Sequence, residues 1–169
     1  PIPVEYEIIV VDDNSSDSTG DVVSRECEKD GRIRLIASKG GHGLGKSLKK
    51  GFNASKGDII AVLTGDLSDD PKDIPIMLKK IRDEGYDFVC ASRYIKGGVG
   101  RQINVIKEFF SKSLGRAIHI ITKVPTLDPT NAYKMFRRNV LKNIGPINSD
   151  RYTLGLELVL KAHKQGFRI

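Results

Sequence analysis

The fold class is decided by residues 6–19, YEIIVVDDNSSDST, where an apolar run ends at two aspartates and a helix start follows. The β-branched run at 6–11 predicts a buried strand, and Ser18 or Thr19 can cap a helix that continues to Asp30. The same order of strand and helix recurs over the first hundred residues. We expect further strands at 33–37, 58–63 and 88–91, and further helices at 44–54 and 71–85.

Strands that alternate with helices form right-handed βαβ units. We therefore predict an α/β fold with a mostly parallel sheet and helices on both faces. In such sheets, ligands bind at the carboxyl ends of the strands. Three predicted strands end in polar residues, which are Asp12 and Asp13, then Asp66 with Asp69 and Asp70, and then Ser92 and Arg93. The sequence thus indicates a ligand site at this edge of the sheet.

The second part of the chain, residues 101–169, is basic, whereas the first hundred residues are slightly acidic. It has 13 Lys and Arg and 4 Asp and Glu, compared with 15 and 17 in residues 1–100. This split suggests a divalent cation or sugar at one end and a phosphate at the other, although a solvated basic helix face explains it equally well. Within a single domain, residues 1–169, we expect helices at 103–121, 139–144 and 154–165 and a strand at 133–136.

Length and composition exclude several classes of protein. A chain of 169 residues supports one domain, and 39% apolar with 29% charged residues describes an ordinary globular protein. Two cysteines and three histidines argue against a disulfide scaffold and a structural zinc site. No stretch approaches the roughly 20 apolar residues that span a bilayer. Because the first residue is Pro and no signal-like segment leads the chain, we expect a fragment.

Residues 40–47, GGHGLGKS, fit the phosphate-binding loop G-x-x-x-x-G-K-[ST] between a strand and a helix. A P-loop nucleotide hydrolase that uses Lys46 and Ser47 is therefore an alternative, with Asp66 as its second magnesium-binding element. That loop normally follows the first core strand, whereas here a strand ending in two aspartates precedes it. The acidic strand ends also fit a phosphoacceptor receiver domain, but a receiver needs a lysine where Arg93 stands, and it leaves the basic second part unexplained.

Several segments, taken in order, resemble one family. They are 10–19 (VVDDNSSDST), the spaced glycines of 39–58, 63–71 (LTGDLSDDP), 91–98 (ASRYIKGG), and the later residues Lys107, Ser111, Asp128, Thr130, Arg137 and Arg138. Together they resemble the inverting nucleotide-sugar glycosyltransferases of GT-A fold, glycosyltransferase family 2. Within that family the chain is most similar to the dolichyl-phosphate and polyprenyl-phosphate mannosyltransferases. From the resemblance, we expect the first strand of the family to be missing from this chain.

The resemblance implies a donor site on the acidic first part. Asp13 would recognise the nucleotide base, and Asp12 would brace the turn. Asp66 would be a catalytic residue that holds Mg²⁺ or Mn²⁺ against the donor diphosphate, where the cation helps the nucleotide to depart. Lys46, at a helix N-terminus, is expected to reach a donor phosphate.

The metal-binding region departs from the family in one position. Thr64 stands where the family has the first Asp of its D-x-D motif. We expect either Asp69 or Asp70 to compensate, with Ser68 as a further oxygen ligand, or else a reduced affinity for the cation. Asp69 and Asp70 before Pro71 are explained equally well as the start of a helix.

The resemblance also implies an acceptor site on the basic part. Arg93, Lys107 and Ser111 would bind the phosphate of a lipid acceptor, with Arg93 also counted among the catalytic residues. Asp128 resembles an active-site carboxylate, either as a base or as an orienting group. Glu157 matches a family position on the last helix and can equally be a solvated residue.

The helix at 103–121 mixes Phe109, Phe110 and Leu114 with basic residues, so it is either an interfacial helix on anionic lipid or a core-packing helix. The function expected from the resemblance is transfer of a hexose, with inversion, from GDP-mannose or UDP-glucose to a polyprenyl (dolichyl) phosphate. The expected location is the cytoplasmic side of a membrane, peripheral or anchored by segments outside this chain. The same fold with a non-lipid acceptor is a further alternative, and no nucleic-acid partner is expected.

Overall fold

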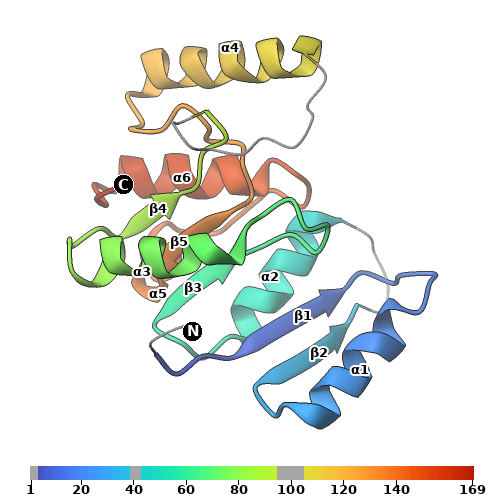
Figure 1. The fold of residues 1–169 in the computed structure, drawn as a ribbon. Helices are drawn as coiled ribbons and strands as arrows, with labels where there is room; N and C mark the ends of the chain where they lie inside the picture. The colour runs from blue at the N-terminus through green and yellow to red at the C-terminus, as the bar shows by residue number, and fades with distance from the viewer. Residues whose placement is uncertain (1–3, 39–42, 95–104) are drawn as a thin grey trace.

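The computed structural model describes residues 4–38, 43–94 and 105–169, with the backbone alone at 105–109. Its first half alternates strands and helices (Figure 1), in the order β1 (Ile8–Asp12), α1 (Thr19–Lys29), β2 (Ile33–Ala37), α2 (Leu44–Ala54), β3 (Ile59–Val62), the 3₁₀ turn η1 (Pro71–Asp73), α3 (Ile74–Arg82) and β4 (Phe88–Cys90). The second half contains α4 (Val105–Thr122), β5 (Lys134–Arg137), α5 (Arg138–Asn143) and α6 (Leu154–Lys164). Each predicted strand and helix is present, with small shifts at the ends.

The five strands form two hydrogen-bonded groups. β1 and β2 pair in parallel, from Ile8 opposite Ile33 to Asp12 opposite Ala37. β5 lies between β3 and β4 and is antiparallel to both, so β3 and β4 run in the same direction. Among the described residues, β1 pairs only with β2, and β3 only with β5. The predicted parallel direction is seen for β1 with β2, and β3 and β4 also share one direction. The exception is β5, which pairs antiparallel to both of its neighbours, because an apolar run indicates a strand but not its direction.

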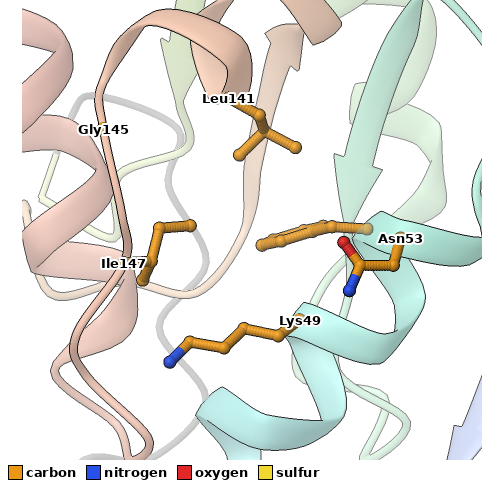
Figure 2. Close-up of a pocket in the computed structure, with 6 residues that line it drawn as sticks. Lys49, Asn53, Leu141, Gly145 and Ile147 are labelled. Atoms are coloured by element: carbon orange, nitrogen blue, oxygen red, sulfur yellow. The ribbon is translucent and has the colours of Figure 1, made fainter.

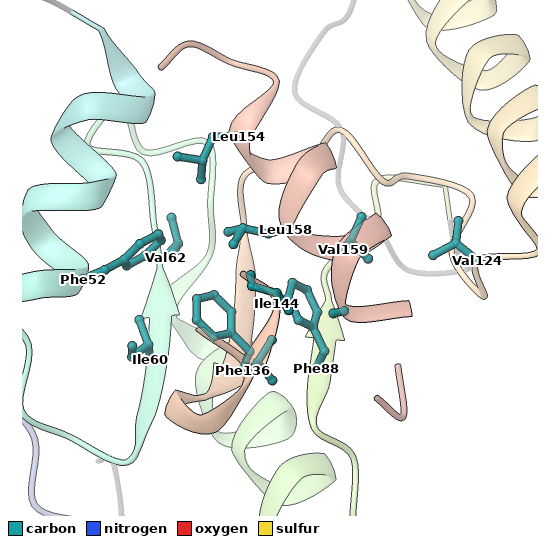
Figure 3. Packing of buried hydrophobic residues seen from close by; sticks show 12 residues of the cluster. Phe52, Ile60, Val62, Phe88, Val124, Phe136, Ile144, Leu154, Leu158 and Val159 are labelled. Carbon is teal, nitrogen blue, oxygen red and sulfur yellow. The ribbon is translucent and has the colours of Figure 1, made fainter. Parts of the chain in front are cut away.

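Side chains alternate across β5, as they do in any strand. Tyr133 and Met135 pack with the buried face of α3 on one side of the sheet. On the other side Phe136 stacks on Phe88, with ring centroids 5.1 Å apart, and meets Phe52 of α2 edge-on at 5.8 Å. Buried residues of α5 and α6 complete this second cluster (Figure 3). Helices therefore cover both faces, as predicted, and β5 joins residues 101–169 to the sheet of the first hundred.

Two boundaries bear on the site. Asp12 is the last residue of β1, whereas the predicted strand ended one residue earlier. The helix predicted from Pro71 begins as the 3₁₀ turn η1, where Asp70 caps the turn by accepting a hydrogen bond from the Lys72 N–H at 2.9 Å. A proline fits at this first position because its missing N–H would have had no partner there.

No helix in the described part of the chain has both the length and the apolar character needed to cross a bilayer.

Candidate active site

The segment after β3, residues 64–70, is a largely exposed loop, here called the acidic loop, whose side chains bond to one another. The Thr64 backbone N–H donates to Asp69 Oδ2 at 2.8 Å, and the Thr64 hydroxyl lies 2.9 Å from Asp66 Oδ1 and 2.8 Å from Asp69 Oδ2. The Ser68 N–H also donates to Asp66 Oδ1, at 3.0 Å. Hydrogen bonds from Ser68 and then from Thr64 lower the pKa of Asp66 to about 2. The Asp66 carboxylate is therefore ionised at any physiological pH.

Asp69 and Asp70 have different surroundings, although they are adjacent in the sequence. Asp69 is drawn back to Thr64, into the neighbourhood of Asp66. Asp70 instead caps η1, and its carbonyl oxygen accepts the hydroxyl of Tyr133 at 3.0 Å. Of the two aspartates that could compensate for Thr64, the geometry favours Asp69.

The loop suits a hard divalent cation shared with a substrate. It offers carboxylate and hydroxyl oxygens, which Mg²⁺ and Mn²⁺ prefer. Within the described residues there is no group of three or more His, Cys, Asp and Glu able to hold a metal ion. Mg²⁺ is commonly held by one or two carboxylates together with substrate phosphates. Asp66 and Asp69 fit that arrangement.

Arg93, which follows β4, is locked to a buried carboxylate. Asp128 Oδ2 accepts from the Arg93 backbone N–H at 3.0 Å and from Nε at 2.9 Å, and Asp128 Oδ1 accepts from Nη2 at 2.7 Å. Asp128 is 1% exposed, whereas one third of the Arg93 side chain is exposed, at 33%. This pairing raises the pKa of Arg93. Because both oxygens of Asp128 are engaged by Arg93, the geometry favours an orienting role for Asp128 over that of a base.

Two strand-end segments thus meet at one edge of the sheet. Tyr133, at the start of β5, bonds to the acidic loop through Asp70, and Asn131 donates to the Ala91 carbonyl at the end of β4 at 3.0 Å. Asp69 contributes to the electrostatic environment of Arg93. Asp69, Arg93 and Asp128 are therefore brought together, and Asp66 is linked to Asp69 through Thr64. The sequence placed Asp66, Asp69 and Arg93 at strand ends, whereas Asp128 was expected only from the family resemblance.

Lys134 also lies in this region, although it was not among the site residues predicted from the sequence. It is 1% exposed on β5, and its Nζ donates to the carbonyl oxygens of Pro129, at 3.1 Å, and of Asn131. Burial lowers the pKa of Lys134, while Cys90 and Asp128 act in the opposite direction. The sequence contained one indication of this burial. Lys134 is two residues from Phe136, so both side chains lie on the same face of β5.

The end of β1 faces the start of α2. Asp12 Oδ1 accepts from the backbone N–H and hydroxyl of Ser15, at 3.0 and 2.5 Å, so this carboxylate braces the turn. Asp13 Oδ2 accepts from the Gly43 N–H at 2.7 Å. Lys46 is exposed on the first turn of α2. The predicted roles of Asp13 in base recognition and of Lys46 in phosphate binding stay predictions.

The described part of the GGHGLGKS stretch does not form an open phosphate cradle. A Cβ at Gly45 would lie 2.5 Å from the Asp150 carbonyl carbon, and one at Gly43 would lie 2.7 Å from the Asp150 carbonyl oxygen. The start of α2 is therefore covered by the chain before α6. Lys49 also bonds to the Asp150 carboxylate, at 2.7 Å. This packing argues against the P-loop alternative.

The helix α4 packs closely on the Asp128 segment through one residue. A Cβ at Gly115 would lie 2.1 Å from the Leu127 carbonyl oxygen. Ser111 is half-buried one turn earlier, while the side chain of Lys107 lies outside the described residues. Lys112, which was not among the predicted site residues, has its Nζ 5.3 Å from the centroid of the Tyr94 ring, and the Arg93 guanidinium lies at the same distance from that ring.

The Glu157 side chain, on α6, is largely buried, and its hydrogen-bond and ion-pair partners do not include Arg93. It accepts from the backbone N–H groups of Asn148 and Ser149, at 2.9 and 2.7 Å, and pairs with Lys161 at 2.7 Å. Burial raises the pKa of Glu157, but these hydrogen bonds outweigh it and bring the pKa to about 2. Glu157 therefore fixes the segment that covers α2.

Two cavities lie outside the acidic loop. One of about 470 Å³ is lined in part by Cys90, Ser92 and Tyr94, beside the Arg93 cluster. Burial raises the pKa of the Cys90 thiol to about 11. The other, of about 250 Å³, lies between α2 and the chain after α5 (Figure 2), where Lys49 is its one charged lining residue. Its lining offers no acid–base pair, so it is not the candidate site.

Comparison with known proteins identifies the family. Residues 3–145 match Glycosyl transferase family 2. The chain belongs to this family. It is 28% identical over 162 residues to a dolichol-phosphate mannosyltransferase of Pyrococcus furiosus, covering 94% of the chain and 45% of that protein. It is 31% identical over 142 residues to an undecaprenyl-phosphate 4-deoxy-4-formamido-L-arabinose transferase of Serratia proteamaculans, covering 81% and 40%. The chain thus spans less than half the length of these relatives.

Solved structures confirm the fold class. Glucosyl-3-phosphoglycerate synthase from Mycobacterium tuberculosis, in complex with phosphoglyceric acid, superposes with a TM-score of 0.68 at 20% identity, covering 94% of the chain and 54% of that protein. The same enzyme with Mn²⁺, UDP-glucose and phosphoglyceric acid gives 0.66 at 18% identity, covering 92% and 53%. These structures confirm the α/β prediction, and the match over residues 3–145 confirms the resemblance to the family.

Proposed function

We propose that the protein containing this chain transfers a hexose from a nucleotide-sugar to a polyprenyl phosphate. The observation that carries the proposal is the Arg93–Asp128 pair beside the acidic loop, because it puts a fixed guanidinium next to a candidate metal site. A reaction between a diphosphate donor and a phosphate acceptor needs both. The names of the two relatives, which act with dolichol phosphate and undecaprenyl phosphate, support the same reaction.

The donor side would use the first part of the chain. Asp13 would accept an N–H of the nucleotide base, and Lys46 would bind a donor phosphate. Asp66 and Asp69 would hold Mg²⁺ or Mn²⁺, which neutralises the charge that develops on the leaving diphosphate. Mn²⁺ with UDP-glucose in the structural neighbour supports a divalent cation and a uridine donor, and the mannosyltransferase relative supports GDP-mannose.

On the acceptor side, Arg93 would bind the lipid phosphate. A guanidinium has five N–H donors, and Asp128 takes one from Nε and one from Nη2, so Arg93 can bind a phosphate without leaving Asp128. Lys107 and Ser111, from α4, would complete the site. A phosphate oxygen forms the bond to the anomeric carbon while the bond to the donor diphosphate breaks, which inverts the configuration. A phosphate is already ionised at neutral pH, so no strong base is required.

The outer face of α4 supports a membrane surface as the place where the lipid is met. Phe110, Leu114 and Ile121 recur at helical spacing and are 67, 52 and 80% exposed. Exposed basic residues, Lys112 and Arg116, lie on the same helix. An apolar stripe with flanking cations suits the headgroup region of an anionic bilayer. We propose that this contact is on the cytoplasmic side.

A soluble phosphate-bearing acceptor is a second candidate. Phosphoglyceric acid bound to the structural neighbour favours it, since Arg93 can bind the phosphate of either acceptor. The two candidates share the donor and differ in what α4 contacts.

Thermal unfolding of the full-length protein tests the donor, using GDP-mannose, UDP-glucose, UDP-N-acetylglucosamine, GTP and ATP with and without Mn²⁺. A ligand that binds only the native state raises the midpoint. We expect a Mn²⁺-dependent rise with one nucleotide-sugar. A rise with ATP or GTP alone, abolished by Lys46→Ala, would refute the transferase.

Sugar transfer then separates the two acceptors. Short-chain polyprenyl phosphate in anionic vesicles should accept the sugar, and phosphoglycerate should not. A variant with Phe110, Leu114 and Ile121 all changed to Ser should lose vesicle binding while keeping the donor-induced rise. Transfer to phosphoglycerate alone would favour the second candidate.

A further inference from the structure

We propose that Lys134 is a positioning residue of this enzyme, one that fixes the segment carrying Asp128 and thereby holds Arg93 in place. The inference builds on the proposed function, since it gives Lys134 a part in acceptor binding. It rests on a juxtaposition that neither the family match nor the relatives assign: a fully buried ammonium group beneath the carboxylate that locks Arg93.

The bonds of Lys134 fall on either side of a single turn. Its Nζ donates to the carbonyl oxygens of Pro129, at 3.1 Å, and of Asn131. Pro129 directly follows Asp128, and the Asn131 N–H bonds back to the Asp128 carbonyl oxygen at 3.3 Å. The ammonium group therefore fastens the turn whose first residue supplies the carboxylate.

The turn is also tied to the two neighbouring strand ends. Asn131 donates from its side-chain amide to the Ala91 carbonyl at 3.0 Å, two residues before Arg93. Tyr133 donates to the Asp70 carbonyl in the acidic loop. Lys134 thus sits at the base of the turn that carries Asp128, and a shift of this turn would first move the carboxylate that holds Arg93.

A buried lysine is an expensive way to fill a core position. Burial of an ammonium group carries a large desolvation penalty, and apolar replacements of buried ion pairs are often neutral or stabilising. The charged and titratable groups acting on Lys134 are Cys90 from β4, Asp128 and Arg93 from the site, and Asp69 from the acidic loop. Asp128, Arg93 and Asp69 belong to the candidate site, and Cys90 is the last residue of the adjacent strand. We infer that the ion is kept there because it fixes geometry at the site.

The test compares Lys134→Met with Lys134→Arg and with Met135→Ala in the full-length protein. Met135 is an equally buried neighbour that points to the opposite face of β5, so Met135→Ala is a stability control that leaves the turn intact. For Lys134→Met we expect the acceptor KM to rise about tenfold, with the donor KM changed less than about twofold. Lys134→Arg should recover part of this loss, and Met135→Ala should lower the melting temperature without the KM split. Equal changes in both KM values would overturn the proposal.

A second measurement does not depend on sugar transfer. Hydrogen exchange of the Arg93 Nε–H, followed by ¹⁵N NMR and assigned with Arg93→Lys, reports whether the guanidinium is still held by Asp128. We expect exchange to be about tenfold faster in Lys134→Met than in the wild type and unchanged in Met135→Ala. Unchanged exchange in Lys134→Met would refute the role of Lys134. If Lys134→Met does not fold, the same comparison on Lys134→Gln decides.

These readouts separate the two proposals. Failure of the wild type to use any polyprenyl phosphate, with fast Arg93 exchange in Lys134→Met, would refute the lipid acceptor and keep the positioning role. Normal transfer to polyprenyl phosphate, with no effect of Lys134→Met on the acceptor KM, would support the lipid acceptor and refute the positioning role of Lys134.

Discussion

The acidic loop and the Arg93 cluster, which consists of Arg93, Asp128 and Lys134, lie at the same edge of the sheet, yet they differ in the range of their contacts and in their burial. In the loop, Thr64, Asp66 and Asp69 bond to residues at most five positions away, and Asp66 is exposed while Thr64 and Asp69 are half-buried. In the cluster, Arg93 and Asp128 are 35 positions apart, and both Asp128 and Lys134 are 1% exposed. Changes in the loop should therefore alter chemistry with little cost in stability, whereas changes in the cluster should cost both.

The largest expected effect is on activity and lies in the loop. Asp66→Asn should lower the transfer rate about 100-fold or more, because a carboxylate that would hold the cation is lost. Asp69→Asn should lower it about tenfold and recover at higher Mn²⁺. Steady-state assays over a Mn²⁺ series measure both.

Asp70→Asn is the matched control for these two variants, since it keeps a capping side chain on η1 and lies outside the proposed metal site. It should leave the rate within about twofold of the wild type. An equal loss in Asp69→Asn and Asp70→Asn would contradict the assignment of Asp69.

The largest expected effect on stability lies in the cluster. Asp128→Asn removes the buried partner of Arg93, and it should lower the free energy of unfolding by about 2–3 kcal/mol, below the usual cost for a buried pair because Arg93 can regain water. Urea denaturation measures the loss. Asp66→Asn, in the exposed loop, should change stability by less than about 0.5 kcal/mol. Comparable losses in the two variants would remove the contrast between the two regions.

A pair of glycines sharpens the same contrast without changing any charge. A Cβ at Gly115 meets the Leu127 carbonyl oxygen, whereas one at Gly65, in the acidic loop, meets no atom within 4 Å. Gly115→Ala should therefore cost about 1–3 kcal/mol, and Gly65→Ala less than about 0.5 kcal/mol. Thermal unfolding of both variants checks this. No loss in Gly115→Ala would show that α4 does not pack closely on the Asp128 segment.

The smallest effect concerns Glu157, away from both regions. Its pKa is about 2 in the native state and about 4.3 when unfolded. A depressed pKa stabilises the native state above the unfolded value, and this contribution is lost as the pH falls from about 4 towards 2. Glu157→Gln should thus cost about 1–2 kcal/mol at pH 7 and less at pH 3, as measured by urea denaturation. A cost that does not change with pH would contradict the ionised hydrogen-bonded state of Glu157.

The sequence was most informative where structure is local. The strands and helices follow from apolar periodicity, and the acidic loop follows from a turn between Thr64 and Asp70. The sequence could not determine the direction of β5, because that direction depends on its pairing with β3 and β4, which are far away in the chain. For the same reason the lock between Arg93 and Asp128 and the contacts of Lys134 were out of reach: each depends on where β5 enters the sheet. The roles of Asp69 and Asp70 could be distinguished only from the different hydrogen bonds that the two carboxylates form in the structure.

The most direct test of the account is to measure donor and acceptor binding separately in two variants. Calorimetric titrations would use the nucleotide-sugar with Mn²⁺, and a short-chain polyprenyl phosphate, on the wild type, Asp66→Asn and Arg93→Met. We expect Asp66→Asn to weaken donor binding about tenfold or more and to leave acceptor binding unchanged. Arg93→Met should weaken acceptor binding about tenfold or more and leave donor binding unchanged. Loss of the same ligand in both variants, or of neither, would contradict the division of the site into a metal-binding loop and an acceptor-binding cluster.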